Sequence, residues 1–358
     1  MSHKLTNPPR GRGATFNPEG RFSAEAREAF DDGWGDLPEE PRQVPTTVSA
    51  ETARSIISRN DSPDIPFTQS INPYRGCEHG CIYCYARPSH AYLSLSPGLD
   101  FETRLTAKVN AAELLRAELA RPGYRCEPIA LGANTDPYQP AEREWRITRE
   151  VLEVLSECEH PLTITTKSAL VERDLDLLAP MAEKRLARVY LSVATLDHEL
   201  ARKLEPRASA PRRRIEAIRR LALAGVPTGV FASPMIPALT DAQLETVLET
   251  AREAGAEDAG YTLLRLPHEV GELFKAWLER HYPLKAGHVM SLVRQMRGGA
   301  ENDPAFGTRM RGEGVFADLL AQRFRVACER LGLNRDRRPG LNCGCFRRPA
   351  SAGQLGLF

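Results

Sequence analysis

From Phe67 onward, short apolar segments alternate with amphipathic segments, and this alternation restricts the fold more than any other feature of the sequence. The apolar segments predict strands over residues 67–72, 128–133, 162–166, 187–193, 226–231 and 260–264. The intervening segments predict helices over residues 107–119, 142–157, 172–182, 211–224 and 241–254. Gly225 and Gly255 follow the last two helices, as glycine often does at a helix end. Such alternation favours a parallel sheet with right-handed crossovers. Six units are fewer than the eight of a closed barrel, so we expect an α/β fold, a partial (β/α)6 TIM-like barrel with its chemistry at the carboxyl ends of the strands.

Both ends of the chain differ from this alternating region. Residues 1–66 are rich in proline, glycine, arginine and acidic residues, which predicts an irregular N-terminal extension with a short helix over residues 51–57. The barrel is expected over residues 67–266, and a helical C-terminal region over residues 267–333, with helices over residues 269–280, 287–297 and 314–331. Residues 334–358 are rich in arginine, proline and glycine and predict a flexible tail.

Composition excludes several classes of protein. Hydrophobic residues make up 42% of the chain, charged residues 27%, and the net charge is +1, which excludes wholesale disorder and a polyelectrolyte chain. No apolar run approaches the roughly 18–20 residues of a membrane span, and the N-terminus lacks the apolar stretch of a secretory signal. We therefore expect a cytoplasmic protein with no membrane partner.

Three of the eight cysteines, Cys77, Cys81 and Cys84, follow the first predicted strand with the spacing CxxxCxxC. Three thiolates on a tight loop can hold three irons of a 4Fe–4S cluster and leave the fourth iron open, and an open coordination position marks a site that does chemistry. Two other interpretations compete. One is a structural zinc site with His79, Cys343 or Cys345 as fourth ligand, although the sequence has no second CxxC pair. The other is ordinary packing of three loop cysteines.

The cysteine spacing, with an aromatic residue before the third cysteine, resembles the radical S-adenosylmethionine (SAM) superfamily. The wider sequence resembles the subgroup related to spore photoproduct lyase, often labelled DNA repair photolyase-like, through INPYRGCEHGCIYCYARPSH, SPGLDFET, TDPYQPAE, LSVATLD and SPMIPALTD. This resemblance implies that SAM binds the open iron, and that the reduced cluster cleaves SAM to methionine and a 5′-deoxyadenosyl radical, which abstracts hydrogen from a substrate. It also implies an electron donor such as flavodoxin or ferredoxin.

The resemblance assigns SAM-binding positions to the strand ends. Gly132, Ala133, Asn134 and Thr135 occupy the place of the family's glycine-rich motif, without its usual acidic residue. The other implied SAM contacts are Tyr83, Lys167, Ser192, Met235 and Ile236. Each position also fits a plainer role, as a capped turn, a polar loop or core packing.

Further residues near the same rim are candidates for catalysis or for a substrate pocket: Tyr85, Arg87, His90, Asp136, Tyr138 and Gln139. Spore photoproduct lyases use an additional cysteine near the end of the second strand as a hydrogen donor, and LGANTDPY has none at that place. Cys126 precedes the strand, so we expect it at the opposite end of the barrel. Cys343 and Cys345 either approach the cavity as a donor or redox pair, or are two free thiols of the tail.

Basic residues suggest a nucleic-acid partner. Residues 294–348 contain 12 arginines, no lysine and 6 acidic residues, and Arg212, Arg213 and Arg214 form a second basic run. Such patches contact phosphates, although solvated basic faces are also common. Together with the resemblance, they favour nucleic acid, including damaged DNA, as the substrate. The alternatives are radical SAM modification of a protein or metabolite, and a zinc-stabilised, clamp-associated binding module with no catalysis.

The last five residues, QLGLF, resemble the QLxLF peptide by which bacterial replication and repair proteins dock on the DNA sliding clamp. Such a tail presents one amide and three apolar anchors to a groove, here Gln354, Leu355, Leu357 and Phe358. The alternative is a tail that packs on its own domain.

Overall fold

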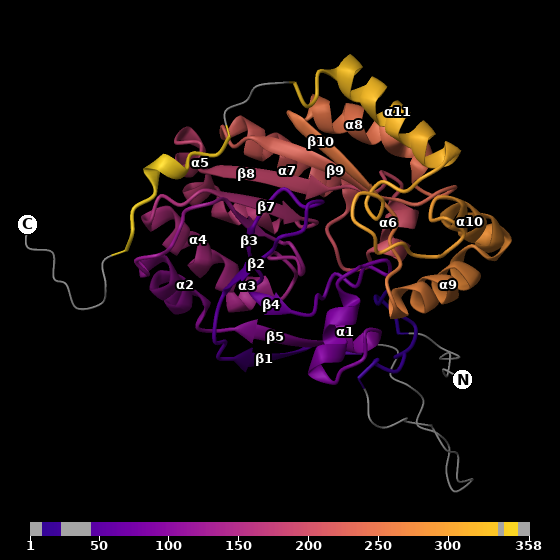
Figure 1. The fold of residues 1–358 in the computed structure, drawn as a ribbon, viewed down its shortest axis with the longest axis horizontal. Coiled ribbons are helices and arrows are strands. Elements are labelled where there is room, and N and C mark those ends of the chain that lie inside the picture. The colour runs from indigo at the N-terminus through magenta and orange to yellow at the C-terminus, as the bar shows by residue number, and fades with distance from the viewer. Residues whose placement is uncertain (1–8, 23–43, 336–339, 350–358) are drawn as a thin grey trace, which may run out of the picture.

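A seven-stranded sheet forms the framework of the computed structural model, which describes residues 9–22, 44–335 and 340–349 (Figure 1). In hydrogen-bonding order its strands are β10 (Asp258–Leu263), β9 (Thr228–Met235), β8 (Ala187–Ser192), β7 (Leu162–Thr166), β6 (Ile129–Leu131), β3 (Gln69–Ile71) and β2 (Ile57–Arg59). All neighbouring pairs are parallel except β2 with β3. Strands β10 and β2 are the two edges, so the barrel is open. The predicted partial barrel of six parallel strands is confirmed.

A second, three-stranded sheet contains β1 (Thr47–Glu51), β5 (Arg104–Lys108) and β4 (Tyr74–Arg75), with α1 (Leu99–Thr103) beside it (Figure 1). Strands β1 and β2 both lie within residues 1–66, which we expected to be irregular. The predicted helix over residues 51–57 is wrong, because its first residue ends β1 and its last begins β2. The helix predicted from residue 107 starts late, because Leu105 and Ala107 are alternate buried positions of β5.

Five helices cover the outer side of the main sheet: α2 (Ala111–Ala120), α4 (Ile147–Glu157), α5 (Leu175–Glu183), α7 (Pro211–Leu223) and α8 (Leu244–Glu253) (Figure 1). The helix predicted over residues 142–157 is two helices, α3 (Glu142–Trp145) and α4, because Arg146 between them has a φ of 52°. The helices predicted from residues 172 and 241 begin as 3-10 turns, η2 (Ala169–Asp174) and η3 (Asp241–Gln243). Gly225 and Gly255 have φ values of +78° and +103° directly after α7 and α8, which confirms them as helix-ending glycines.

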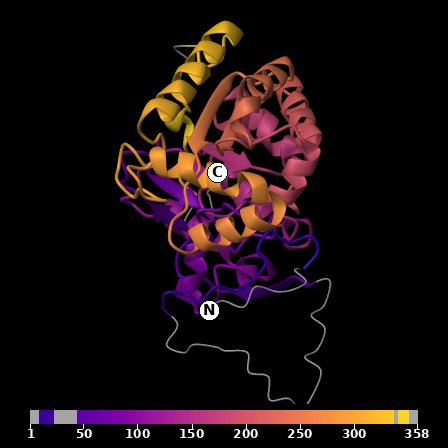
Figure 2. The same cartoon turned by 90° about the vertical axis from the view of Figure 1, so that its right-hand side faces the viewer.

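Six further helical segments are present among the described residues. They are η1 (Arg87–Leu93), α6 (His198–Leu204), α9 (Glu269–His281), α10 (Pro283–Gln295), α11 (Val315–Leu331) and η4 (Cys343–Cys345). Helices α9 and α10 pack together, and α11 packs on α8 along the edge of the molecule (Figure 2). Over the described residues, none of the helices has both the length and the apolar character needed to span a bilayer.

Two large apolar groups of side chains hold these layers together, beside a small third group of Cys77, Ala86 and Phe101. The larger lies between the main sheet and its outer helices. The smaller contains Phe274 and Trp277 of α9 together with Cys81, Ile82 and Tyr83. The loop that carries the clustered cysteines is therefore packed against the helical C-terminal region.

Candidate active site

The three clustered cysteines lie on one loop after β4, residues 76–86, called here the cysteine loop. Cys77 and Cys81 are buried and Cys84 is partly buried. Backbone hydrogen bonds fix the loop at both ends: the Cys77 N–H donates to the Phe101 carbonyl at 2.9 Å, and the Ile82 N–H to the Leu204 carbonyl at 3.0 Å. The loop is thus tied to α1 on one side and to the end of α6 on the other.

The chemistry of this donor set fits an iron–sulfur cluster. Burial raises the pKa of the Cys81 thiol well above its ordinary value, and the neighbouring Cys84 and Cys77 thiols raise it further. The thiolates of this loop, two buried and one partly buried, therefore need positive charge close by, which a metal centre supplies. Among the described residues, no three His, Cys, Asp or Glu side chains converge on a site for a single metal ion. A 4Fe–4S cluster does not need such convergence, because each thiolate binds its own iron.

Lys167 follows β7 and lies beside the loop. Burial lowers the pKa of its ammonium, but the Cys81 thiol, Glu205 and Asp136 outweigh burial and raise it overall. Lys167, which was predicted to lie near SAM or near negative charge on the substrate, is therefore a positively charged residue close to the cysteine loop.

Asp136, a substrate candidate, joins two strand ends to the cysteine loop. Its carboxylate accepts hydrogen bonds of 2.7 Å from the Thr166 hydroxyl and the Lys167 backbone N–H. The His79 Nδ1 lies 3.3 Å from the same carboxylate. Burial raises the pKa of Asp136, but the charge of His79 and these hydrogen bonds outweigh it and lower the pKa to about 2. Asp136 is therefore an ionised residue that positions the loop.

Four other substrate candidates are at most 1% exposed, so the expectation that they line the rim is wrong: Arg87, His90, Tyr138 and Gln139. Arg87 donates to the carbonyls of Cys81 at 2.9 Å and Gly80 at 3.2 Å. His90 Nε2 lies 3.0 Å from the Arg104 carbonyl. Tyr138 packs in the main core with the guanidinium of Arg173 over its ring.

Gln139 holds the backbone on both sides of Cys77. Its side-chain Nε2 donates to the Gly76 carbonyl at 3.1 Å, and its Oε1 accepts from the Glu78 N–H at 2.8 Å. Because these groups are buried, a side chain that satisfies both of them fixes the loop in place.

A buried polar network lies next to Cys81. The Tyr83 hydroxyl and the Arg214 guanidinium both donate to the carboxylate of Glu205. Arg214 also donates to the Ser192 carbonyl at 2.8 Å and the Ser209 carbonyl at 2.7 Å. Burial raises the pKa of Glu205, but Arg214 and Lys167 outweigh burial and lower it. Arg214 is only 2% exposed, so it does not belong to the surface patch predicted for Arg212–Arg214.

The predicted SAM-binding turn follows β6. A Cβ on Gly132, whose φ is +89°, would lie 2.1 Å from the Thr165 carbonyl oxygen, so only glycine fits there. The Asn72 side chain, which the sequence did not single out, accepts from the N–H groups of Asn134 at 2.9 Å and Thr135 at 3.3 Å. The Thr135 hydroxyl donates to the Tyr74 carbonyl at 2.9 Å.

The other candidates lie at the ends of β8 and β9 or contact the end of β6. The Tyr85 hydroxyl donates to the Ala133 carbonyl, which ties the cysteine loop to the end of β6. The Ser192 hydroxyl donates to the Ser233 carbonyl at 3.2 Å. Met235 and Ile236 are fully buried, and Ile236 belongs to the apolar group that contains Cys81 and Tyr83.

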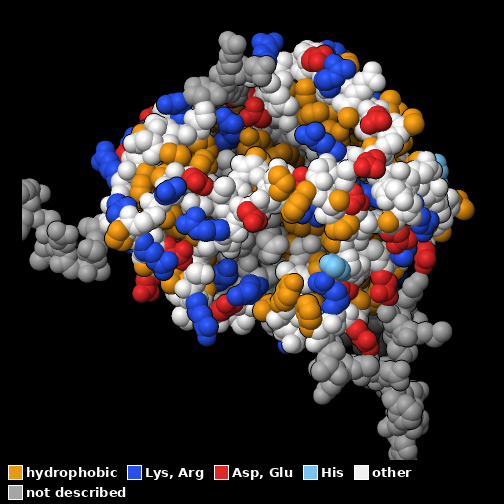
Figure 3. All heavy atoms as spheres, in the orientation of Figure 1, with side chains coloured by type: hydrophobic (Ala, Val, Ile, Leu, Met, Phe, Trp, Pro, Cys, Tyr) orange, Lys and Arg blue, Asp and Glu red, His pale blue; other side chains and the backbone are white. Residues whose placement is uncertain are grey.

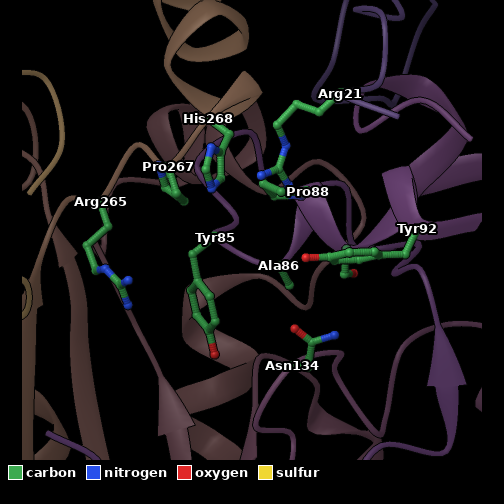
Figure 4. A pocket seen from close by; sticks show the side chains of 10 residues that line it. Arg21, Tyr85, Ala86, Pro88, Tyr92, Asn134, Arg265, Pro267 and His268 are labelled. Carbon is green, nitrogen blue, oxygen red and sulfur yellow. The ribbon is translucent and has the colours of Figure 1, made fainter. Parts of the chain in front are cut away.

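An entrance pocket of about 260 Å³ opens beside Tyr85 and Ala86, the residues that follow Cys84 (Figure 4). Its lining residues are Arg21, Tyr85, Ala86, Pro88, Ser89, Tyr92, Asn134, Arg265, Pro267 and His268. The Arg265 guanidinium lies 5.6 Å from the centre of the Tyr85 ring, and the Tyr92 side chain is 73% exposed. Of these residues the sequence analysis proposed only Tyr85 and Asn134. Ala86, Pro88 and Ser89 belong to the cysteine motif but were not singled out, and the others come from segments without a recognisable motif.

Cys343 and Cys345 lie at the opposite end of the barrel, so of the two alternatives the one in which they approach the cavity is wrong. The Asn342 N–H donates to the Arg185 carbonyl at 2.9 Å and the Arg347 N–H to the Cys158 carbonyl at 2.8 Å. Both acceptors precede strands, and the Cys343 thiol lies beside that of Cys126. Cys126 is therefore at the opposite end, as predicted, and neither tail cysteine can complete a zinc site with the cysteine loop.

The C-terminal arginines are largely engaged within the molecule. Arg309 pairs with Asp64 at 2.6 Å, Arg323 with Glu245 at 2.6 Å, and Arg330 with Glu249. Basic and acidic side chains are interspersed on the face seen in Figure 3. Six of the twelve arginines predicted to form the basic patch over residues 294–348 thus pair with a carboxylate. Gln354, Leu355, Leu357 and Phe358 lie outside the described residues.

The sequence profile of the radical SAM superfamily matches residues 71–251, about half of the chain, and includes the cysteine loop from Cys77 onward. The chain belongs to the radical SAM superfamily. Members of this superfamily normally use a 4Fe–4S cluster and SAM.

The relatives and structures compared fit this assignment. An uncharacterized protein of Mycobacterium tuberculosis is 39% identical over 233 residues, which cover 64% of this chain and 68% of that protein. An uncharacterized protein of Methanocaldococcus jannaschii is 28% identical over 213 residues, 60% of this chain and 76% of its own. Spore photoproduct lyase complexed with dinucleoside spore photoproduct has a TM-score of 0.56 at 17% identity and covers 80% of both chains, which is a likeness of fold.

Proposed function

We propose that this protein is a radical SAM enzyme that holds a 4Fe–4S cluster on Cys77, Cys81 and Cys84. The observation that supports it most is the set of two buried thiols and one partly buried thiol on one loop, fixed from several sides by buried polar residues and open toward a pocket at the carboxyl ends of parallel strands. With SAM bound, such a cluster supplies a 5′-deoxyadenosyl radical that abstracts hydrogen from a substrate. We propose that the radical SAM core spans residues 67–266, flanked by an N-terminal extension, a helical region from residue 267 and a tail from residue 334.

The residues around the cavity have separate roles in this proposal. The turn Gly132–Thr135 presents backbone groups to SAM, and Lys167 presents its ammonium to the carboxylate of SAM or to negative charge on the substrate. Ser192, Met235 and Ile236 line the cavity edge at β8 and β9, and Tyr83 orients the cysteine loop through Glu205. Apolar walls such as Ile236 exclude water, which protects a reactive radical from side reactions.

Nucleic acid, including damaged DNA, is the substrate class that we favour. The entrance pocket carries Arg21 and Arg265 with two aromatic rings, Tyr85 and Tyr92. Guanidinium groups bind phosphates, and exposed rings stack on bases. The solved structures of similar fold include spore photoproduct lyase with a dinucleoside spore photoproduct, which supports this choice.

The two alternatives differ in how well they fit the site. Modification of a protein or metabolite by the same chemistry needs the same cavity, and only a substrate assay separates it from DNA repair. A zinc-stabilised, clamp-associated module is less favoured, because the distal cysteines lie at the other end of the barrel.

Two macromolecular partners belong to the proposal. The chemistry needs one electron, and we expect flavodoxin or ferredoxin to supply it. The terminal residues Gln354, Leu355, Leu357 and Phe358 are proposed to dock on the DNA sliding clamp. A clamp pull-down with and without the five terminal residues tests this second partner, and equal capture of both chains would reject it.

SAM cleavage tests the proposed function. The protein is reconstituted with iron and sulfide without oxygen, reduced with dithionite, and mixed with SAM, with and without ultraviolet-damaged oligonucleotides. We expect 5′-deoxyadenosine from the wild type, more of it with damaged DNA, and none from Cys84→Ala. Failure of the loaded wild type to form it under both conditions would reject the proposal. Equal amounts with and without DNA would instead favour the protein or metabolite alternative.

A further inference from the structure

The N-terminal segment at residues 9–22, called here the N-terminal strap, runs between α1 and the start of α9 (Figure 1). Asn17 and Asp100 exchange hydrogen bonds of 3.2 and 3.1 Å at α1. At the other end, Arg21 pairs with Glu269 of α9 at 3.0 Å. An irregular segment held at both ends in this way has a defined path over the molecule.

The strap packs directly against the cysteine loop. Ala14 and Phe16 are 1% and 2% exposed. They lie in the same apolar group as Cys81, Ile82 and Tyr83. Removal of a buried aromatic side chain leaves a cavity, so Phe16 is a major source of the stability of this contact.

A buried carboxylate connects the strap to the loop. Glu102 is fully buried and accepts the backbone N–H of Gly13 at 2.9 Å and of Ala14 at 2.8 Å. The same carboxylate pairs with Arg87 at 2.5 Å, and Arg87 donates to the Gly80 and Cys81 carbonyls. Without the strap, Glu102 would lose two donors, and a buried carboxylate with fewer partners is costly.

The strap and the loop also touch backbone to backbone. A Cβ on Gly13 would lie 1.9 Å from the Gly80 carbonyl oxygen. Any side chain at position 13 must therefore displace either the strap or the loop between Cys77 and Cys81.

We propose that the N-terminal strap is part of the cluster site, where Gly13 and Phe16 are positioning residues that hold the cysteine loop in its ligating conformation and keep solvent from its outer side. This inference rests on the proposed function, because it presupposes a cluster on the loop. Residues 9–22 lie before the region that matches the superfamily profile, so the strap is an addition to the shared core.

Cluster retention in the full-length protein tests the strap. The variants are Gly13→Val and, as a matched control, Gly123→Val, since a Cβ on Gly123 meets nothing within 4 Å. After anaerobic reconstitution, bound iron and the bleaching of visible absorbance in air are measured, and circular dichroism checks the fold. We expect Gly13→Val to lose its absorbance about tenfold faster than the wild type, because the loop opens more readily. Gly123→Val should match the wild type.

Phe16→Ala provides a second, sterically mild variant in case Gly13→Val does not fold. It should bleach faster than the wild type, and Phe16→Leu should recover most of the difference. Folded variants that bind as much iron as the wild type and bleach at the same rate would overturn the strap proposal. A wild type that takes up no cluster would instead reject the proposed function, which keeps the two failures distinct.

Discussion

The Gln139 side chain accepts the backbone N–H of Glu78 at 2.8 Å, one residue after the first clustered cysteine. Together with the bond from its Nε2 to the Gly76 carbonyl, it brackets Cys77. A residue that sequence analysis placed at the substrate rim is thus a clamp on the ligand loop.

Replacement of Gln139 by leucine should loosen that loop. Two buried backbone groups lose their partners, at about 1–3 kcal/mol for each unsatisfied group. We expect a lower free energy of unfolding for the protein without metal and weaker iron uptake, measured by urea unfolding and iron analysis. Gln295→Leu, at an exposed position of α10, is the control and should change neither quantity. An unchanged unfolding free energy in Gln139→Leu would contradict the clamp.

Two adjacent arginines should differ sharply in their effect on stability. Arg214→Met leaves the Glu205 carboxylate buried without its main partner, which should cost about 3–5 kcal/mol of unfolding free energy. Arg213 is half exposed and 3.4 Å from Glu172, so Arg213→Met should cost less than about 1 kcal/mol. Urea unfolding of both variants measures the difference, and similar losses would refute the assignment of Arg214 to the interior.

The stability that Glu205 provides should disappear in acid. Its pKa is lowered in the folded protein, so its contribution is complete above the unfolded value and is lost as the pH falls through the folded value. The difference in unfolding free energy between wild type and Glu205→Gln should therefore be constant near neutral pH and shrink below about pH 4. A difference that grew on acidification would show that the pKa of this carboxyl is raised.

Arg265 should contribute to nucleic-acid affinity through the entrance pocket. Arg265→Gln is expected to weaken binding of a short single-stranded oligonucleotide. It should also reduce the slope of log affinity against log salt concentration by the amount of about one phosphate contact. Fluorescence anisotropy at several salt concentrations measures both quantities. Arg325→Gln serves as control, because Arg325 pairs with Glu329 on α11, away from the pocket lining. Equal affinity and salt slope in wild type and Arg265→Gln would argue against phosphate contact at this pocket.

Periodicity predicted the parts of the fold that form long, regular patterns. All six parallel strands and the helices that cover them follow from apolar spacing, and β7 matches its predicted bounds. Strands β1 and β2 consist of exposed and half-buried residues, and β4 has only two residues, so none of them carries an apolar pattern. The break between α3 and α4 depends on one residue, Arg146, in the left-handed region, and nothing in its identity predicts that conformation.

Buried polar side chains were the main source of error in the site. Arg87 and Arg214 looked like surface or substrate residues because arginine is usually exposed. Both are buried, because each pairs with a carboxylate on another element. Arg87 pairs with Glu102 of α1, and Arg214 pairs with Glu205 at the end of α6. The cysteine spacing is a local pattern and identified the loop that carries the three thiols, whereas such tertiary pairs are not visible in a single sequence.

The most direct test of the central claim is the metal content of the anaerobically reconstituted wild type beside the variant with Cys77, Cys81 and Cys84 replaced by alanine. Iron and acid-labile sulfide are assayed chemically, and the reduced protein is examined by electron paramagnetic resonance. We expect roughly four irons and four sulfides per chain in the wild type, with the signal of a reduced 4Fe–4S cluster, and neither in the variant. A wild type that binds a single zinc and no sulfide would contradict the account.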